Sequence, residues 1–175
     1  MTTVRRMTTE TSVEVTLGGG TSIATGEPFL DHMVAVLARY GGFDLRVAAH
    51  GDLRHHLIED VAITIGEAVR RIVPPTCRRY GERTIPMDDA LVQVALDVGG
   101  RFHYGGRLPS DLYDHWMRSF ADAARITLHL RVLRGRDRHH VVEAGFKATG
   151  LALRDALCDD GAVLSTKGRV ALEAE

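Results

Sequence analysis

The chain has 175 residues, of which 45% are hydrophobic, and it can bury a sizeable core as one domain or as two fused halves. Its 22 basic and 23 acidic residues give a formal net charge of -1, which gives no reason to expect nucleic acid or a membrane surface as a partner. Because the first residues lack a signal-peptide apolar region, no apolar run nears the roughly 20 residues of a membrane span, and the two cysteines have no metal-binding spacing, we expect an unprocessed cytoplasmic protein.

The first half of the sequence has two segments with strand-like alternation and two with helical spacing of apolar residues. They predict a strand over 12–17, a helix over 33–40, a strand over 43–47 and a helix from 55 to about 73. Gly41 and Gly42 stop the first helix, and Pro74 and Pro75 end the second. The first half therefore reads strand, helix, strand, helix.

The second half repeats this order. The pattern predicts a strand over 92–98, a helix over 111–124, a strand over 126–132 and a helix from 139 to about 157. We therefore expect an α+β fold made of two similar halves, about 1–80 and 81–175, in a single catalytic domain that covers residues 1–175. The only linker candidate is residues 74–81.

Two stretches of the chain carry nearly the same polar residues. Asp31-His32 precedes His55-His56-Leu57-Ile58-Glu59, and Asp114-His115 precedes His139-His140-Val141-Val142-Glu143. The separation is 23 residues from His32 to His55 and 24 from His115 to His139, and these motifs hold six of the nine histidines. Matched spacing of this kind indicates a duplicated unit.

The His-His-x-x-Glu motifs predict metal sites. On a helix the first histidine and the glutamate are four residues apart and share a face, whereas the second histidine is turned by about 100°. Each helix can thus bind one ion and offer its second histidine to another. A solvated helix start, the alternative, explains neither the repeat nor the spacing. Three imidazoles and one carboxylate per site suit Mn²⁺ or Fe²⁺, and the sequence leaves Zn²⁺ open.

The two copies differ beside the metal motif in a way that predicts an anion site. Lys147 follows Glu143 by four residues, and the matching position in the first copy is Ile63. Further basic residues lie within two residues of a glycine: Arg79 in Arg78-Arg79-Tyr80-Gly81, Arg101 after Gly99-Gly100, and Lys167 in Ser165-Thr166-Lys167-Gly168. Because such positions combine cationic side chains with accessible backbone N–H groups, a phosphate is the expected ligand.

A family resemblance extends from about Arg6 to Lys167. The segments that carry it are 6–11, 29–33, 41–44, both His-His-x-x-Glu motifs, Pro86-Met87-Asp88, 118–120, 143–147 and 165–168. In these segments the chain resembles imidazoleglycerol-phosphate dehydratase. The resemblance implies a lyase of histidine biosynthesis that dehydrates imidazole glycerol phosphate to imidazole acetol phosphate.

The resemblance also implies the roles of individual residues. It implies two Mn²⁺ ions per active site, one held by His55, Glu59, His115 and His140, the other by His32, His56, His139 and Glu143. It places the substrate phosphate on Arg79, Arg101, Lys147, Ser165 and Lys167. The candidate carboxylates for proton transfer are Glu10, Asp88 and the metal-held Glu59 and Glu143.

For architecture, the resemblance implies duplicated split βαβ halves, each a mixed sheet with two helices packed on it. It further implies a homo-oligomer of 24 subunits built from trimers, with active sites shared between chains.

Two other functions remain possible on the residues alone. One is a dinuclear metal-dependent phosphate-ester hydrolase, and the other is a metal-binding or shell-forming protein without catalytic activity.

Overall fold

The two halves of the chain fold in the same order, as a computed structural model of residues 1–163 describes them. The first half contains β1 (Thr2–Met7), β2 (Thr11–Leu17), β3 (Ser22–Ala24), α1 (Pro28–Gly41), β4 (Leu45–Gly51) and α2 (Arg54–Ile72). The second contains β5 (Tyr80–Met87), β6 (Ala90–Asp97), β7 (His103–Gly105), α3 (Asp111–Ala123), β8 (Thr127–Arg134) and α4 (Arg138–Ala156).

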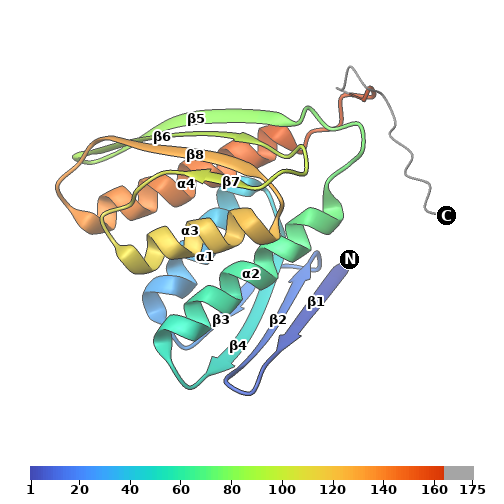
Figure 1. Cartoon of the computed structure of the whole chain (residues 1–175), viewed down its shortest axis with the longest axis vertical. Coiled ribbons are helices and arrows are strands. Elements are labelled where there is room, and N and C mark those ends of the chain that lie inside the picture. Colours follow the sequence, from blue (N-terminus) through green and yellow to red (C-terminus); the bar gives the residue numbers. More distant parts are fainter. Residues whose placement is uncertain (164–175) are drawn as a thin grey trace.

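Each half forms one four-stranded mixed sheet. The strand orders are β1-β2-β4-β3 and β5-β6-β8-β7, with one parallel pair in each sheet, β3 with β4 and β7 with β8. The helix between the parallel strands, α1 or α3, makes each half a split βαβ unit. Figure 1 shows the two sheets as outer layers with the four helices between them. The predicted duplicated α+β fold is confirmed.

The four predicted helices agree with the structure to within a few residues at most ends, but four strands escaped prediction. β3 and β7 have only three residues each, too few to show alternation. β1 and β5 are edge strands in which few side chains face the core, so a full apolar face is missing. The predicted linker was too long, because Tyr80 and Gly81 already belong to β5 and Cys77 pairs with Asp159.

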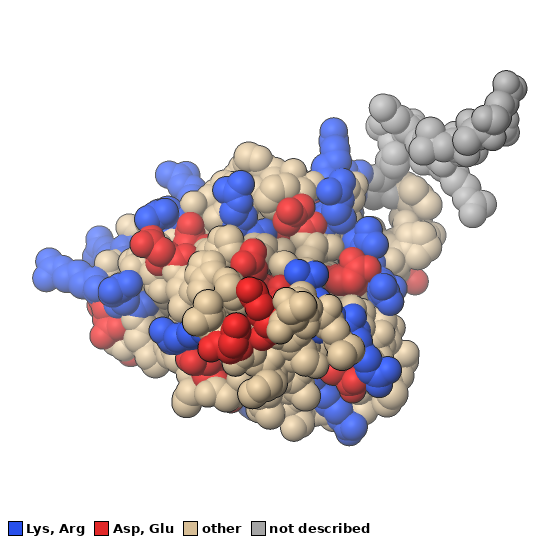
Figure 2. Space-filling model, turned by 60° about the horizontal axis from the view of Figure 1, so that its bottom comes forward, with Lys and Arg blue, Asp and Glu red and all other residues tan. Residues whose placement is uncertain are grey.

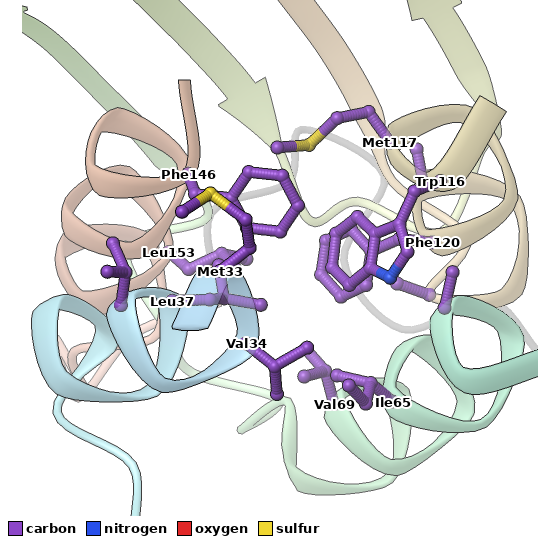
Figure 3. Close-up of a cluster of buried hydrophobic side chains, with 14 of the residues drawn as sticks. Met33, Val34, Leu37, Ile65, Val69, Trp116, Met117, Phe120, Phe146 and Leu153 are labelled. Atoms are coloured by element: carbon purple, nitrogen blue, oxygen red, sulfur yellow. The ribbon is translucent and has the colours of Figure 1, made fainter. Parts of the chain in front are cut away.

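The helices pack in pairs that join the two halves. α1 lies against α4, and α2 lies against α3, so each pair takes one helix from each half. Apolar side chains from all four helices meet between the pairs, and the labelled ones in Figure 3 include Met33, Ile65, Trp116 and Phe146. The buried side chains of both sheets belong to the same core. Within residues 1–163, no helix is long and apolar enough to cross a membrane.

A glycine at the same place in the repeat allows each helix pair to approach closely. A Cβ atom on Gly66 of α2 would lie 2.6 Å from the carbonyl oxygen of Phe120 in α3. A Cβ atom on Gly150 of α4 would lie 2.8 Å from the carbonyl oxygen of Leu37 in α1. Both distances are too short for a real contact, so the backbones need glycine here.

We predict that Gly66→Ala and Gly150→Ala each lower the melting temperature, although alanine is the better helix former. The added methyl group meets backbone that cannot rotate away, and overpacking of this kind costs about 1–3 kcal/mol. Gly145→Ala is the control, because its new Cβ would lie at an ordinary 3.4 Å from Leu108 and gain about 1 kcal/mol of helix propensity. Thermal unfolding of the three variants checks this; equal melting temperatures would contradict it.

Candidate metal centre

The aspartate of each Asp-His motif fixes the start of a helix rather than facing a metal. Asp31 Oδ1 accepts hydrogen bonds from the backbone N–H and the hydroxyl of Thr25, at 2.9 and 2.6 Å. Asp114 Oδ1 accepts from the Tyr104 hydroxyl and the Leu108 N–H, both at 2.7 Å. The two aspartates thus tie the ends of β3 and β7 to α1 and α3, which sets the direction of the next residue, a histidine.

The first cluster of possible metal ligands lies between α1 and α4. His32 from α1 meets His139 and Glu143 from α4, and one ligand atom of each lies within 4.8 Å of the others. Glu143 Oε2 is 3.2 Å from His32 Nε2 and 3.0 Å from His139 Nε2. Its other oxygen accepts from Lys147 Nζ at 2.9 Å. Burial opposes ionisation, but the hydrogen bonds from Lys147 and His32 outweigh it and hold the pKa of Glu143 below its ordinary value.

The second cluster is the equivalent group between α2 and α3. His55 and Glu59 from α2 meet His115 from α3, again with ligand atoms within 4.8 Å. Glu59 Oε1 is 3.1 Å from His115 Nε2, Glu59 Oε2 is 4.0 Å from His55 Nε2, and the two imidazole rings stack at 5.1 Å. Ile63 replaces the lysine of the other cluster, so this glutamate has no such cation on its helix face.

The geometry of both clusters fits a divalent ion. Ligand atoms bound about 2.1 Å from an octahedral ion, at right angles, lie about 3 Å apart, which is close to three of the four His–Glu distances found here. His115 Nε2 is buried and has no aligned hydrogen-bond partner in the protein, and a metal-binding nitrogen in the absence of its ion has the same property. Two imidazoles and one carboxylate per cluster are the donors that Mn²⁺, Fe²⁺ and Zn²⁺ accept.

The second histidines do not join these clusters within one chain. His56 Nδ1 lies 2.9 Å from Glu10 Oε2, although not in hydrogen-bond alignment. His140 lies against the turn between β5 and β6, with Nδ1 2.8 Å from Asp89 Oδ1 and Nε2 3.3 Å from Asp88 Oδ2. In a single chain, therefore, only three of the four predicted ligands of each site lie together. The rotation of the second histidine around its helix accounts for the separation.

Of the four carboxylates predicted for proton transfer, Glu59 and Glu143 lie in the clusters, and Glu10 and Asp88 lie in two equivalent turns. Glu10 lies in the β1–β2 turn, and Asp88 lies in the β5–β6 turn with φ 47°, in the left-handed region that non-glycine residues rarely adopt. Sequence reasoning missed Asp89, whose pKa is lowered to about 2 by hydrogen bonds from the Arg136 N–H and from His140. The sequence signal that could have identified Asp89 is its position in the β5–β6 turn, which is equivalent to that of Glu10 in the β1–β2 turn.

The predicted phosphate ligands are far apart in one chain. Lys147 lies at the first cluster, whereas the backbone N–H of Arg79 donates to the carbonyl of Ala156 at the other end of α4. Lys147 lies nine residues before Ala156, which is about 14 Å along α4 at 1.5 Å per residue. Arg101 lies in the loop between β6 and β7. Ser165 and Lys167 lie outside the described residues.

The Arg79 side chain is held in place by the strand next to it. Its guanidinium donates to both carboxylate oxygens of Asp97, at 2.7 and 3.0 Å, and the first of these oxygens also accepts from the Gly99 N–H. A Cβ atom on Gly99 would lie 2.4 Å from the guanidinium, so only glycine allows this approach.

On the face drawn in Figure 2, acidic side chains gather near the middle with basic ones around them, rather than in one basic stripe.

Comparisons with known proteins give one family. The model of the family described as imidazoleglycerol-phosphate dehydratase matches residues 25–153. The chain is 46% identical to the imidazoleglycerol-phosphate dehydratase of Anaeromyxobacter sp. (strain Fw109-5), over 94% of this chain and 91% of the relative. It is 44% identical to that of Acidothermus cellulolyticus, over 95% and 91%.

Two solved structures have the same fold. One is the crystal structure of IGPD from Pyrococcus furiosus in complex with (S)-C348, with a TM-score of 0.88 and 40% identity over 95% of this chain and 100% of that chain. The other is imidazoleglycerol-phosphate dehydratase from Staphylococcus aureus, with a TM-score of 0.80 and 31% identity over 90% and 98%.

We predict that Lys147→Met destabilises the metal-free protein at pH 7 by about 1–3 kcal/mol, because a buried carboxylate loses a charged partner. The loss should shrink as the pH falls below 4.5. Glu143 has a lowered pKa in the folded state, so its contribution is present above the unfolded value and is lost as the carboxylate is protonated. Ile63→Met, at the equivalent position, should change little. Denaturant unfolding of the variant and the parent at pH 7 and below pH 4.5 measures this, and a loss independent of pH would contradict it.

Proposed function

The chain belongs to the imidazoleglycerol-phosphate dehydratase family of lyases in histidine biosynthesis, and on that premise we propose that each His/Glu cluster holds one divalent ion, Mn²⁺ by preference, for the dehydration of imidazole glycerol phosphate. One observation carries the proposal. In both clusters a histidine from one half meets a His-x-x-x-Glu pair from the other half, at distances that suit an ion.

Each proposed centre receives its fourth protein ligand from another copy of the chain. His140 of one copy would complete the cluster of His55, Glu59 and His115, and His56 of one copy would complete that of His32, His139 and Glu143. The support is geometric, since both second histidines lie outside the clusters of their own chain. We propose the assembly that the family resemblance implies, a shell of 24 subunits built from trimers, with each chain a single catalytic domain in the cytoplasm.

Bound divalent ions would act as Lewis acids on the ring nitrogens of the substrate and help the ring to take up electron density. A carboxylate of the protein takes the proton from C2 of the glycerol chain while hydroxide leaves the carbon next to the ring. Glu10 and Asp88 are the candidates for this step, because their carboxylates are about half and more than two thirds exposed, beside His56 and His140. Glu59 and Glu143 serve as metal ligands, and the resulting enol becomes the ketone.

The phosphate of the substrate would be held by Lys147 and by arginines that another copy brings. Lys147 is 2.9 Å from Glu143, so a phosphate bound to it would lie beside that cluster. Arg79 is attached at the C-terminal end of α4, nine residues beyond Lys147, and we assign the Arg79 that contacts this phosphate to a neighbouring chain. Asp97 orients this guanidinium in a fixed plane, which suits two parallel hydrogen bonds to an anion.

A dinuclear phosphate-ester hydrolase is the less favoured alternative. Such enzymes hold two ions about 3.5–4 Å apart, commonly with a shared carboxylate. Within residues 1–163 the two clusters have no residue in common, and each has its own glutamate. The arrangement favours two separate ions, each of which would be held by its own cluster.

We predict that His55→Ala and His140→Ala each abolish formation of imidazole acetol phosphate and remove one bound ion per chain. The reason is that both residues belong to the same proposed centre although they lie apart in one chain. Product formation with and without Mn²⁺, together with metal analysis of the purified variants, measures the effect. Turnover at the parental rate in either variant would refute the site.

Mixing these two variants tests whether centres are shared between chains. After dissociation and reassembly together, some centres receive an intact His55 from one variant and an intact His140 from the other, and activity should return. Each variant reassembled alone is the control and should stay inactive. If both ligands came from the same chain, no mixed assembly would regain activity.

A further inference from the structure

Asp89 connects the turn between β5 and β6 to the start of α4 through both of its oxygens. Oδ2 accepts hydrogen bonds from the backbone N–H groups of Arg136 and Asp137, at 2.6 and 3.2 Å. Oδ1 lies 2.8 Å from Nδ1 of His140. The Asp137 side chain in turn caps α4 by accepting from the N–H groups of His139 and His140. The carboxylate of Asp89 is therefore held in one orientation beside the imidazole.

This arrangement fixes which ring nitrogen carries the proton. With two backbone donors on Oδ2, the carboxylate is oriented as an acceptor, and Nδ1 of His140 must be its donor. Nε2 then keeps its lone pair and faces away from Asp89. A histidine that binds a metal commonly donates its other ring N–H to a carboxylate in this way, which fixes the tautomer and the ring plane.

We propose that Asp89 is a positioning residue that presents Nε2 of His140 to a metal ion held by the His55, Glu59 and His115 cluster of a neighbouring copy. The inference rests on the proposed function, in which His140 is the fourth ligand. Asp89 itself touches neither ion nor substrate. It acts only through the orientation and tautomer of His140.

The other half of the chain supports the assignment independently. Glu10 lies in the β1–β2 turn, 79 residues before Asp89, and its Oε2 is 2.9 Å from Nδ1 of His56. Val13 and Val15 of β2 match Val92 and Val94 of β6 at the same offset, so the two acids hold equivalent positions. In each half, therefore, the outer hairpin places a carboxylate within 2.9 Å of Nδ1 of the second histidine, with hydrogen-bond alignment for Asp89 and without it for Glu10.

The neighbouring Asp88 gives a matched control. Its carboxylate is exposed and lies 3.3 Å from Nε2 of His140, on the opposite side of the ring from Asp89. Asp88→Asn removes the same charge from the same turn but leaves the contact with Nδ1 intact. A general effect of charge on cation binding would be equal in the two variants, whereas an effect through the tautomer would be confined to Asp89.

The experiment compares Asp89→Asn with the parent and with Asp88→Asn in the full chain. An asparagine can turn its oxygen to the N–H groups of Arg136 and Asp137 and its amide N–H₂ to Nδ1, so the loop stays anchored while the proton moves to Nε2. Mn²⁺ binding is measured from the electron paramagnetic resonance signal of the free ion, and the melting temperature is measured after chelation. We expect Asp89→Asn to weaken one of the two ions about 10–100-fold, with the other ion and the metal-free melting temperature unchanged.

Three results would overturn the inference. They are parental Mn²⁺ affinity in Asp89→Asn, an equal loss in Asp88→Asn, and a fall in the metal-free melting temperature with loss of both ions, which would give Asp89 a structural role only. His140→Ala separates this from the proposed function. If that variant keeps both ions, His140 is not a ligand and the proposed function fails. If it loses one ion while Asp89→Asn loses none, only the inference fails.

Discussion

The pairing of helices across the two halves is the constraint on which the rest of the structure depends. α1 packs on α4 and α2 on α3, and glycines at equivalent places bring the paired backbones close together. Because the Asp-His motif starts one helix of each pair and the His-His-x-x-Glu motif starts the other, packing alone brings their side chains together. Two similar halves packed separately, each on its own sheet, would separate His32 and His115 from the His-x-x-x-Glu pairs that they meet here.

The duplication has produced two clusters that are alike in ligands and different in charge. In one, Lys147 contacts a buried Glu143 and neutralises it; in the other, Ile63 leaves Glu59 without such a cation. A cation beside a metal ligand disfavours binding of the ion but attracts an anionic substrate. The pseudo-symmetry of the fold thus supplies two similar His/Glu clusters, and a single difference in the repeat, Lys147 against Ile63, makes their electrostatics unequal.

Much of this could be read from the sequence because the informative residues repeat. The helices have long periodic patterns and were predicted closely, and the matched spacing of the histidines indicated the duplication, whereas each predicted set of four ligands is only three in one chain. Strands β3 and β7 were missed because three residues show no period, and β1 and β5 because an edge strand buries few side chains. The anchoring roles of Asp31 and Asp114 depend on Thr25, just after β3, and on Tyr104 in β7, which no spacing rule connects to them.

The separation of Arg79 from the histidines by the length of α4 has a consequence for the life of the protein in the cell. If the centres are shared between chains as proposed, a newly made monomer would hold the parts of a reaction centre in separate places and would neither retain ions firmly nor act on the substrate. Catalytic activity would then require subunit association, so the turnover rate per chain would depend on the protein concentration by mass action. Quality control would then be built in, since a misfolded copy that cannot associate stays inert.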